Sequence, residues 1–246
     1  MIRAVLLDAH GTLVALEPPA PRLRRLLRER FGVVVGAGEA ERAMRAEIAY
    51  YRRHLGEAAD EAGVQALRGR CAEVLRAQLP QSRALAEVNR EAMTGALVDA
   101  LVFKAFPDAA PALSALREAG LRLVVASNWD ASLPAVLAST GLVDLVDGVV
   151  TSALSGASKP APAVFRAALR LAGVAPAEAL AVGDRLDEDV AGARAAGVEP
   201  ILLVRGDAGD APVRAPCGAP GPGGLRLIRS LAELPRLVAE RSPGLP

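Results

Sequence analysis

The sequence predicts an α/β fold, in which a doubly wound parallel sheet carries an inserted α-helical region. Residues 2–7 form a short apolar run that meets Asp8 and turns at Gly11. After residue 106, helix-like and strand-like segments alternate, whereas the residues in between are helical in pattern. A short apolar run closed by a glycine turn is typical of a strand buried on both faces, and the alternation is typical of a parallel sheet.

The sheet region is expected to begin with a strand at residues 2–7 and to resume after residue 106. Turns at Gly120, Gly141 and Gly197 separate its later segments. We predict strands at 121–126, 148–151, 179–182 and 200–204, and helices at 108–119, 131–140, 161–172, 187–196 and 230–241. Strand 200–204 is expected to be the last parallel strand. The Gly- and Pro-rich run 206–224 is expected to be a surface excursion.

The segment between the first strand and residue 101 lacks strand-like alternation. Gly32, Gly56 and Pro80 interrupt it in the way that helices are usually punctuated. We predict helices at 22–31, 39–55, 60–79 and 83–101. The predicted domains are an α/β core of residues 1–15 and 102–246 and a helical insert of residues 16–101.

The composition of the chain limits the kinds of partner that we expect it to bind. Of 246 residues, 52% are hydrophobic, and the formal net charge is +1, which gives no electrostatic reason to expect nucleic acid or an anionic membrane as a partner. Cys71 and Cys217 lack the spacing of a metal site or disulfide framework. The first strand begins almost at once and leaves no room for a signal peptide. We expect a soluble cytoplasmic protein, as a monomer or a homodimer.

Arginine supplies nearly all of the positive charge. Among 29 basic residues, only Lys104 and Lys159 are lysines. Because a compact ammonium and a planar guanidinium are not interchangeable, a lysine in this background is expected where arginine will not serve.

Polar side chains follow the ends of several predicted strands. These residues are Asp8, Ser127, Lys159 and Asp184. Parallel strands bring their carboxyl ends to one edge of the sheet, and ligands bind at that edge in open α/β sheets. The sequence therefore predicts a functional site there.

The motifs at these positions resemble those of the haloacid dehalogenase superfamily. The first motif reads Asp8-Ala-His-Gly-Thr-Leu13, and the block from Ala181 to Gly197 carries Gly183-Asp184 and Asp189. The resemblance implies a Rossmann-like core and a helical cap that closes over the active site. It also implies that Asp8 is the nucleophile, that Lys159 supplies a fixed positive charge, and that Thr12, Ser127 and Asn128 bind substrate.

A magnesium ion would suit this set of residues, because Mg²⁺ prefers a few carboxylates together with water and substrate oxygens. Asp8, Asp184 and Asp189 are the candidate carboxylate ligands. The resemblance adds the backbone carbonyl of His10. A cation that bridges the carboxylate and a phosphate would remove the repulsion between them.

His10 departs from the phosphatase form of the motif, in which a second aspartate protonates the leaving oxygen and then activates water. Imidazole titrates near neutral pH and is able to do the same work. The alternative is that His10 only packs beneath the cap. The sequence leaves both interpretations open.

Three functions compete. The first is a Mg²⁺-dependent phosphatase of a small phosphorylated metabolite, with an aspartyl-phosphate on Asp8. The second is a 2-haloacid dehalogenase, which also lacks the second aspartate but has no use for the extra acids Asp184 and Asp189. The third is a catalytically weakened member that binds a phosphorylated ligand or a partner protein.

Overall fold

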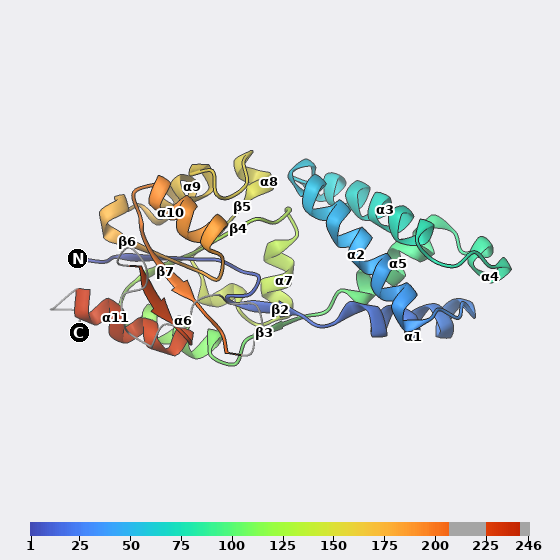
Figure 1. Ribbon diagram of the computed structural model, residues 1–246. Coiled ribbons are helices and arrows are strands. Elements are labelled where there is room, and N and C mark those ends of the chain that lie inside the picture. Colours follow the sequence, from blue (N-terminus) through green and yellow to red (C-terminus); the bar gives the residue numbers. More distant parts are fainter. Residues whose placement is uncertain (207–224, 242–246) are drawn as a thin grey trace. The chain divides into compact units, whose positions relative to one another are not determined.

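A computed structural model describes residues 1–206 and 225–241 (Figure 1). The chain divides into two compact units. Among the described residues, the core unit comprises residues 1–15, 105–129, 133–206 and 225–241, and the helical unit comprises residues 16–104 and 130–132. No helix in the described part of the chain is long and apolar enough to cross a membrane.

The core unit is built on a six-stranded sheet with the order β5-β4-β1-β6-β7-β8. Every pair of neighbouring strands is parallel. The strands are β1 (Ala4–Leu7), β4 (Arg122–Ser127), β5 (Gly148–Thr151), β6 (Ala179–Gly183), β7 (Glu199–Leu203) and β8 (Arg226–Ile228). This parallel, helix-flanked sheet confirms the predicted fold class.

Strand register fixes which polar residues meet. Leu7 pairs with Val125 of β4 and with Val182 of β6. The chain therefore leaves all three strands at the same edge of the sheet, where Ser127 ends β4 and Asp8 and Asp184 follow β1 and β6.

Helices cover both faces of this sheet. In Figure 1, α9 (Ala163–Ala172) and α10 (Ala191–Ala195) lie on one face, and α6 (Ala109–Glu118) and α11 (Leu234–Arg241) lie on the other. Phe165 and Ala168 of α9 belong to the same buried cluster as Leu6 of β1 and Val124 of β4. The short helices α7 (Leu133–Ser139) and α8 (Ser152–Ser155) complete this unit. Its α/β layers match the expectation from the alternating sequence pattern.

Two predictions about this unit were wrong. Residues 200–204 do not form the last parallel strand, because β8 pairs beyond β7. Residues 187–196 are not one α-helix. A π-helical turn at Leu186–Val190 precedes α10, and the amide of Val190 donates to the carbonyl of Arg185 at 3.2 Å. The predicted excursion at 206–224 lies, from residue 207 onward, outside the described residues.

The helical unit contains α1 (Pro19–Phe31), α2 (Ala37–His54), α3 (Glu61–Ala77), α4 (Arg83–Glu87) and α5 (Arg90–Ala100). Buried side chains along one face of each longer helix form a single apolar cluster, which includes Leu23, Leu27, Leu67, Leu75 and Leu97. Polar caps begin three of these helices: Asp60 accepts from the amide of Gly63, Ser82 from that of Leu85, and Asn89 from that of Ala92.

The predicted helix at 83–101 is interrupted. Val88 has an extended backbone (φ −73°, ψ 117°), and Asn89 then caps α5. The guanidinium of Arg76 donates to the carbonyls of Val88 and, at 2.8 Å, of Leu85. Arg76 thus satisfies backbone carbonyls that the interruption removes from the helical pattern.

A two-stranded sheet of β2 (Val14–Leu16) and β3 (Phe103–Ala105) carries the chain out of the core unit and back. The unit boundaries at residues 15/16 and 104/105 fall within these strands. Both strands are missing from the sequence prediction.

Candidate active site

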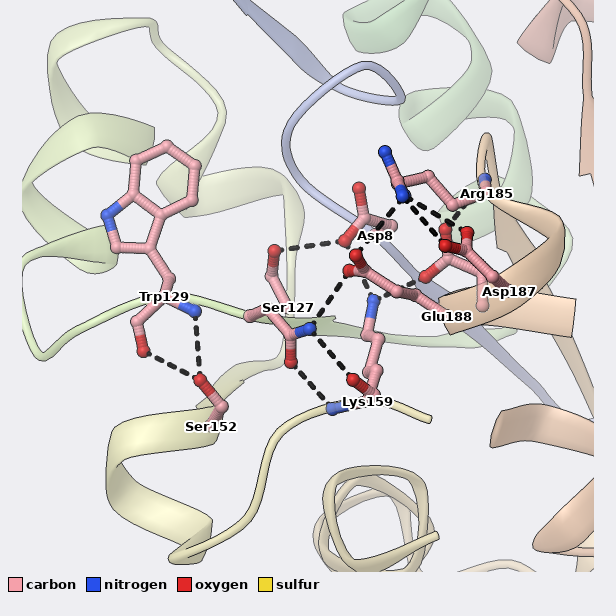
Figure 2. A network of polar contacts seen from close by, with 10 residues as sticks. Asp8, Ser127, Trp129, Ser152, Lys159, Arg185, Asp187 and Glu188 are labelled. Atoms are coloured by element: carbon pink, nitrogen blue, oxygen red, sulfur yellow. Dashed lines mark hydrogen bonds and ion pairs between the residues drawn. The ribbon is translucent and has the colours of Figure 1, made fainter. Parts of the chain in front are cut away.

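Asp8 is the centre of a buried polar network beyond the end of β1 (Figure 2). Its backbone amide donates to the carbonyl of Val182 at 2.8 Å, which continues the sheet by one residue. Its Oδ1 accepts from Ser127 Oγ at 2.9 Å and from Lys159 Nζ at 2.7 Å. Two donors from distant segments therefore fix the orientation of this carboxylate.

Lys159 is a buried cation, with 1% of its side chain exposed. Its Nζ lies 2.7 Å from Asp8 Oδ1 and 2.6 Å from Asp189 Oδ1. Burial alone would lower the pKa of Lys159, but the charges of Asp8 and Asp189 raise it above its ordinary value. The side chain is therefore a permanent positive charge within the acidic cluster.

Asn128 holds the backbone of Lys159. Its Oδ1 accepts from the amide of Lys159 at 2.7 Å, and its Nδ2 donates to the carbonyl of Lys159 at 3.2 Å. The same Nδ2 donates to Glu188 Oε2 at 2.9 Å. Sequence reasoning assigned the backbone amide of Asn128 to substrate and missed this clamp by its side chain.

Gly11 allows the turn after Asp8 to approach Asp184. Gly11 has φ +85°, and a Cβ at this position would lie 2.3 Å from Asp184 Oδ2. A side chain here would therefore be strained and would collide with the carboxylate. Thr12 follows, and its hydroxyl is buried without a hydrogen-bond partner among the described residues. The hydroxyl of Thr12 is therefore an unused hydrogen-bonding group on the turn that follows Asp8.

Three carboxylates lie together in the site. One oxygen from each of Asp8, Asp184 and Asp189 lies within 4.8 Å of the others. Asp184 is the exposed member of the cluster, and partial desolvation together with the charges of Asp8 and Asp189 raises its pKa to about 7. Burial and the charge of Asp8 raise the pKa of Asp189 to about 6, against the lowering effect of Lys159. Such mutual repulsion, at oxygens that Mg²⁺ prefers, gives a cluster suited to binding a divalent cation.

His10 lies two residues after Asp8 and is exposed. Its backbone forms a bridge with Val14 across the turn. The acids Asp187 and Glu188 pair with Arg185, at 2.8 Å and 3.2 Å respectively. The structure thus gathers Asp8, Ser127, Lys159, Asp184 and Asp189, with Thr12 and His10 on the adjoining turn.

Comparison with known proteins bears on what this geometry does. A family profile described as haloacid dehalogenase-like hydrolase matches residues 2–197. The chain belongs to the haloacid dehalogenase-like hydrolases. The resemblance of its motifs to this superfamily is therefore confirmed.

Several members of the family are similar to this chain. Human haloacid dehalogenase-like hydrolase domain-containing protein 3 is 44% identical over 98 residues, which are 40% of this chain and 39% of the relative. A ribulose-1,5-bisphosphate 5-phosphatase from Halopiger xanaduensis is 36% identical over 134 residues, or 54% of this chain and 56% of the relative. The matches thus span about half, or less, of these curated relatives.

Among solved structures, a 2-haloacid dehalogenase from Pseudomonas syringae pv. Tomato is 25% identical, with a TM-score of 0.65. The match covers 98% of this chain and all of that one. Phosphatases and dehalogenases thus both occur among the similar proteins, so the reaction has to be argued from the site itself.

Proposed function

We propose that this hydrolase is a Mg²⁺-dependent phosphatase that acts on a small phosphorylated metabolite through an aspartyl-phosphate on Asp8. The observation that carries the proposal is the cluster of Asp8, Asp184 and Asp189 around the buried Lys159. A similar protein, from Halopiger xanaduensis, is named as a phosphatase of a sugar bisphosphate.

The residues present fit a magnesium ion. Asp8, Asp184 and Asp189 would supply carboxylate oxygens, and the carbonyl of His10 would supply a backbone oxygen. When bound, the ion would neutralise charge between the nucleophile and the phosphate dianion. The carboxylate of Asp189 also accepts hydrogen bonds from Lys159 Nζ at 2.6 Å and from the amide of Arg185 at 3.0 Å. These two donors fix its place in the cluster.

In the proposed reaction, a carboxylate oxygen of Asp8 forms a bond to phosphorus while the bond from phosphorus to the leaving oxygen breaks. Ser127 and Lys159 hold Asp8 in place before the reaction and need no reorganisation during it. Lys159 and the hydroxyl of Thr12 would stabilise negative charge on the phosphoryl oxygens. Water then attacks phosphorus, which releases phosphate and restores the carboxylate.

His10 is the proposed proton carrier. The leaving oxygen needs a proton in the first step, and the attacking water loses one in the second. We propose that the imidazole of His10 moves both protons, because it lies on the exposed side of the turn, two residues after Asp8.

We propose that the helical region, residues 16–101, serves as the cap and contains the residues that determine substrate specificity. The core of residues 1–15 and 102–246 would then carry the chemistry. Near-neutral charge favours a small-molecule substrate over nucleic acid or a membrane, and a cytoplasmic location as a monomer or homodimer remains part of the proposal.

A 2-haloacid dehalogenase is the second candidate, supported by the structural similarity over the whole chain. Asp184 and Asp189 argue against it, because additional carboxylates beside the nucleophile would repel a carboxylate substrate. A weakened member that only binds a phosphorylated ligand or partner is the third. The intact contacts between Asp8 and Lys159 favour activity.

The deciding experiment is a panel of phosphomonoesters, assayed beside 2-chloropropionate with Mg²⁺ or with excess chelator. We expect phosphate release that needs Mg²⁺ and is abolished in Asp8→Asn, which keeps the shape but removes the nucleophile. Asp187→Asn is the matched control, because that exposed acid pairs with Arg185 outside the proposed machinery. Halide release in excess chelator would show that the protein is a dehalogenase and not a phosphatase. Neither product from any substrate would favour the binding protein.

A further inference from the structure

Arg205 follows β7 and contacts the turn that begins at Asp8. Its Nε donates to the carbonyl of Gly11 at 3.3 Å, and one terminal nitrogen donates to the carbonyl of Thr12 at 2.6 Å. The other terminal nitrogen donates to Asp108 Oδ2 at 3.1 Å. About 20% of the Arg205 side chain is exposed, so these contacts are largely shielded from water.

The carbonyls that Arg205 binds belong to the residues closest to the proposed chemistry. Gly11 packs against the carboxylate of Asp184, which would have to move if a Cβ were added to Gly11, and the orphan hydroxyl of Thr12 lies on the next residue. Any displacement of this peptide segment therefore moves the wall against which Asp184 rests. It also moves the Thr12 hydroxyl relative to Asp8.

Arg205 is itself held on its other side. Its guanidinium lies over the ring of Phe106, 3.6 Å from the centroid, and its ion pair with Asp108 is 3.0 Å long. Asp108 Oδ2 also accepts from Ser230 Oγ at 2.7 Å and from the amide of Leu231 at 2.8 Å. Burial would raise the pKa of Asp108, but these donors and Arg205 hold it below its ordinary value. The anchor for Arg205 is thus a charged carboxylate.

We propose that Arg205 is a positioning residue, which holds the Gly11–Thr12 segment against Asp184 and so sets the distance between the nucleophile turn and the carboxylate cluster. This inference rests on the proposed phosphatase function. Arg205 binds residues just before β2 and stacks on Phe106 just after β3. It therefore fixes the base of the two-stranded sheet from both sides.

Arginine is required by the geometry. Its planar guanidinium donates hydrogen bonds to two carbonyls and one carboxylate at once, and its flat face stacks on an aromatic ring. A lysine at this position would keep the charge but could not satisfy the three acceptors and stack at the same time. Arg205→Lys is therefore expected to behave like Arg205→Met.

The test compares these variants with Arg226→Met. Arg226 is the matched control, an arginine of the neighbouring strand β8 that pairs with Glu240 at 3.3 Å on the surface. Hydrogen exchange would be measured in peptides covering residues 9–14, because the amides of Gly11, Leu13 and Val14 all donate to backbone carbonyls there. Mg²⁺ affinity would be measured by calorimetry, and kcat and KM on the best phosphomonoester.

We expect both Arg205 variants to exchange faster at residues 9–14 and to bind Mg²⁺ about tenfold more weakly, with kcat reduced by about tenfold to a hundredfold. KM should change much less than kcat, and Arg226→Met should match wild type. The proposal would be overturned if Arg205→Met had the same Mg²⁺ affinity and the same exchange rates as wild type. It would also be overturned if exchange became faster while Mg²⁺ affinity and kcat both stayed unchanged. Exchange and calorimetry need no substrate, so a wild-type protein that fails to hydrolyse phosphoesters would defeat the phosphatase proposal separately.

Discussion

Lys159 illustrates how a single side chain depends on its surroundings. Its ammonium group lies within 2.7 Å of Asp8 Oδ1 and 2.6 Å of Asp189 Oδ1, with 1% of the side chain exposed. A point charge with three donors fits between two carboxylates, whereas a planar guanidinium needs more width. The other lysine, Lys104, has 68% of its side chain exposed and pairs with Glu17 on the surface.

We predict that Lys159→Arg lowers kcat by about a hundredfold or more, since one electrostatic group in such a site contributes a few kcal/mol. The charge is kept, so the loss would reflect shape. The measurement is steady-state kinetics together with a thermal melt. Lys104→Arg is the control and should match wild type in both. Normal turnover by Lys159→Arg would show that the position requires only a positive charge.

The prediction for His10 concerns leaving groups. An exposed imidazole at this position is a weaker proton donor to an alkoxide than the usual carboxylic acid, because a nearby cation would favour its neutral form. We expect wild type to hydrolyse aryl and acyl phosphates far better than alkyl phosphates. His10→Asp should raise the alkyl phosphate rate selectively, by up to about a hundredfold.

His10→Ala provides the opposing test. It should lower the rate and flatten the pH profile if the imidazole carries protons. An unchanged rate and profile would mean that His10 has no catalytic role. Activity that appears only in His10→Asp would identify the natural protein as a weakened member of the family.

At the residue scale, the sequence was sufficient to place Asp8, Ser127 and Asp184 together, because each lies at or just after the end of a buried strand, whereas Lys159 comes from the loop after α8. It did not show the clamp by Asn128 or the contacts of Arg205. Those depend on partners 31 and 194 residues away along the chain, which no local pattern records. The same strand-end argument would have pointed to Arg205, which lies just beyond β7.

At the scale of elements, prediction failed where a segment was short. The strands β2, β3 and β8 have three residues each, too few to show a period of two. The interruption at Val88 was missed because apolar residues continue through it, while Asn89 acts as a cap rather than as a helix interior residue. The helices α1, α2 and α3 were predicted to within a few residues.

The packing of α2 on α3 contains a buried acid. Glu47 of α2 is 3% exposed, and its carboxyl accepts a hydrogen bond from Cys71 of α3. Burial raises the pKa of Glu47 from 4.5 to about 7, and the bond from Cys71 offsets only part of that rise. Burial and the adjacent Glu47 in turn raise the pKa of the Cys71 thiol.

This raised pKa predicts how stability changes with pH. The folded state binds the proton of Glu47 more tightly than the unfolded state, so stability falls as the pH rises from 4.5 to about 7. The full loss is on the order of 3 kcal/mol. Glu47→Gln should therefore be more stable than wild type at pH 8 but not at pH 4.5.

Hydrogen exchange of α2 and α3 in increasing urea would measure this difference in the helical unit. Glu41→Gln is the matched control, because Glu41 lies on the same helix with 59% of its side chain exposed. It should show no such gain at pH 8. An equal stability difference at both pH values in Glu47→Gln would assign the effect to packing rather than to ionisation.

At the scale of the whole molecule, the two units differ in where their acidic side chains are concentrated. The helical unit is organised around an apolar cluster, whereas the core unit concentrates Asp8, Asp184 and Asp189 at one edge of its sheet. Like charges at this separation oppose folding. A ligand that binds only the folded state offsets that cost, by an amount that grows with the logarithm of its concentration above the dissociation constant.

We therefore predict that Mg²⁺ stabilises the core unit selectively. At a hundred times its dissociation constant, a ligand of the folded state adds about 2.7 kcal/mol to stability. Hydrogen exchange in β1 and β6 should slow with Mg²⁺, whereas exchange in α2 and α3 should not. Sodium chloride at equal ionic strength is the control for screening.

Asp184→Asn distinguishes the effect of Mg²⁺ binding on stability from the effect of charge repulsion. The substitution removes one charge of the cluster while nearly preserving the volume of the side chain. Without Mg²⁺ the variant should be more stable than wild type, since the repulsion from Asp8 and Asp189 is relieved. With Mg²⁺ it should gain less than wild type, so the two effects have opposite signs in one protein. Equal Mg²⁺ stabilisation of the variant and of wild type would remove Asp184 from the proposed ligand set, even if the phosphatase activity itself proved to need the metal.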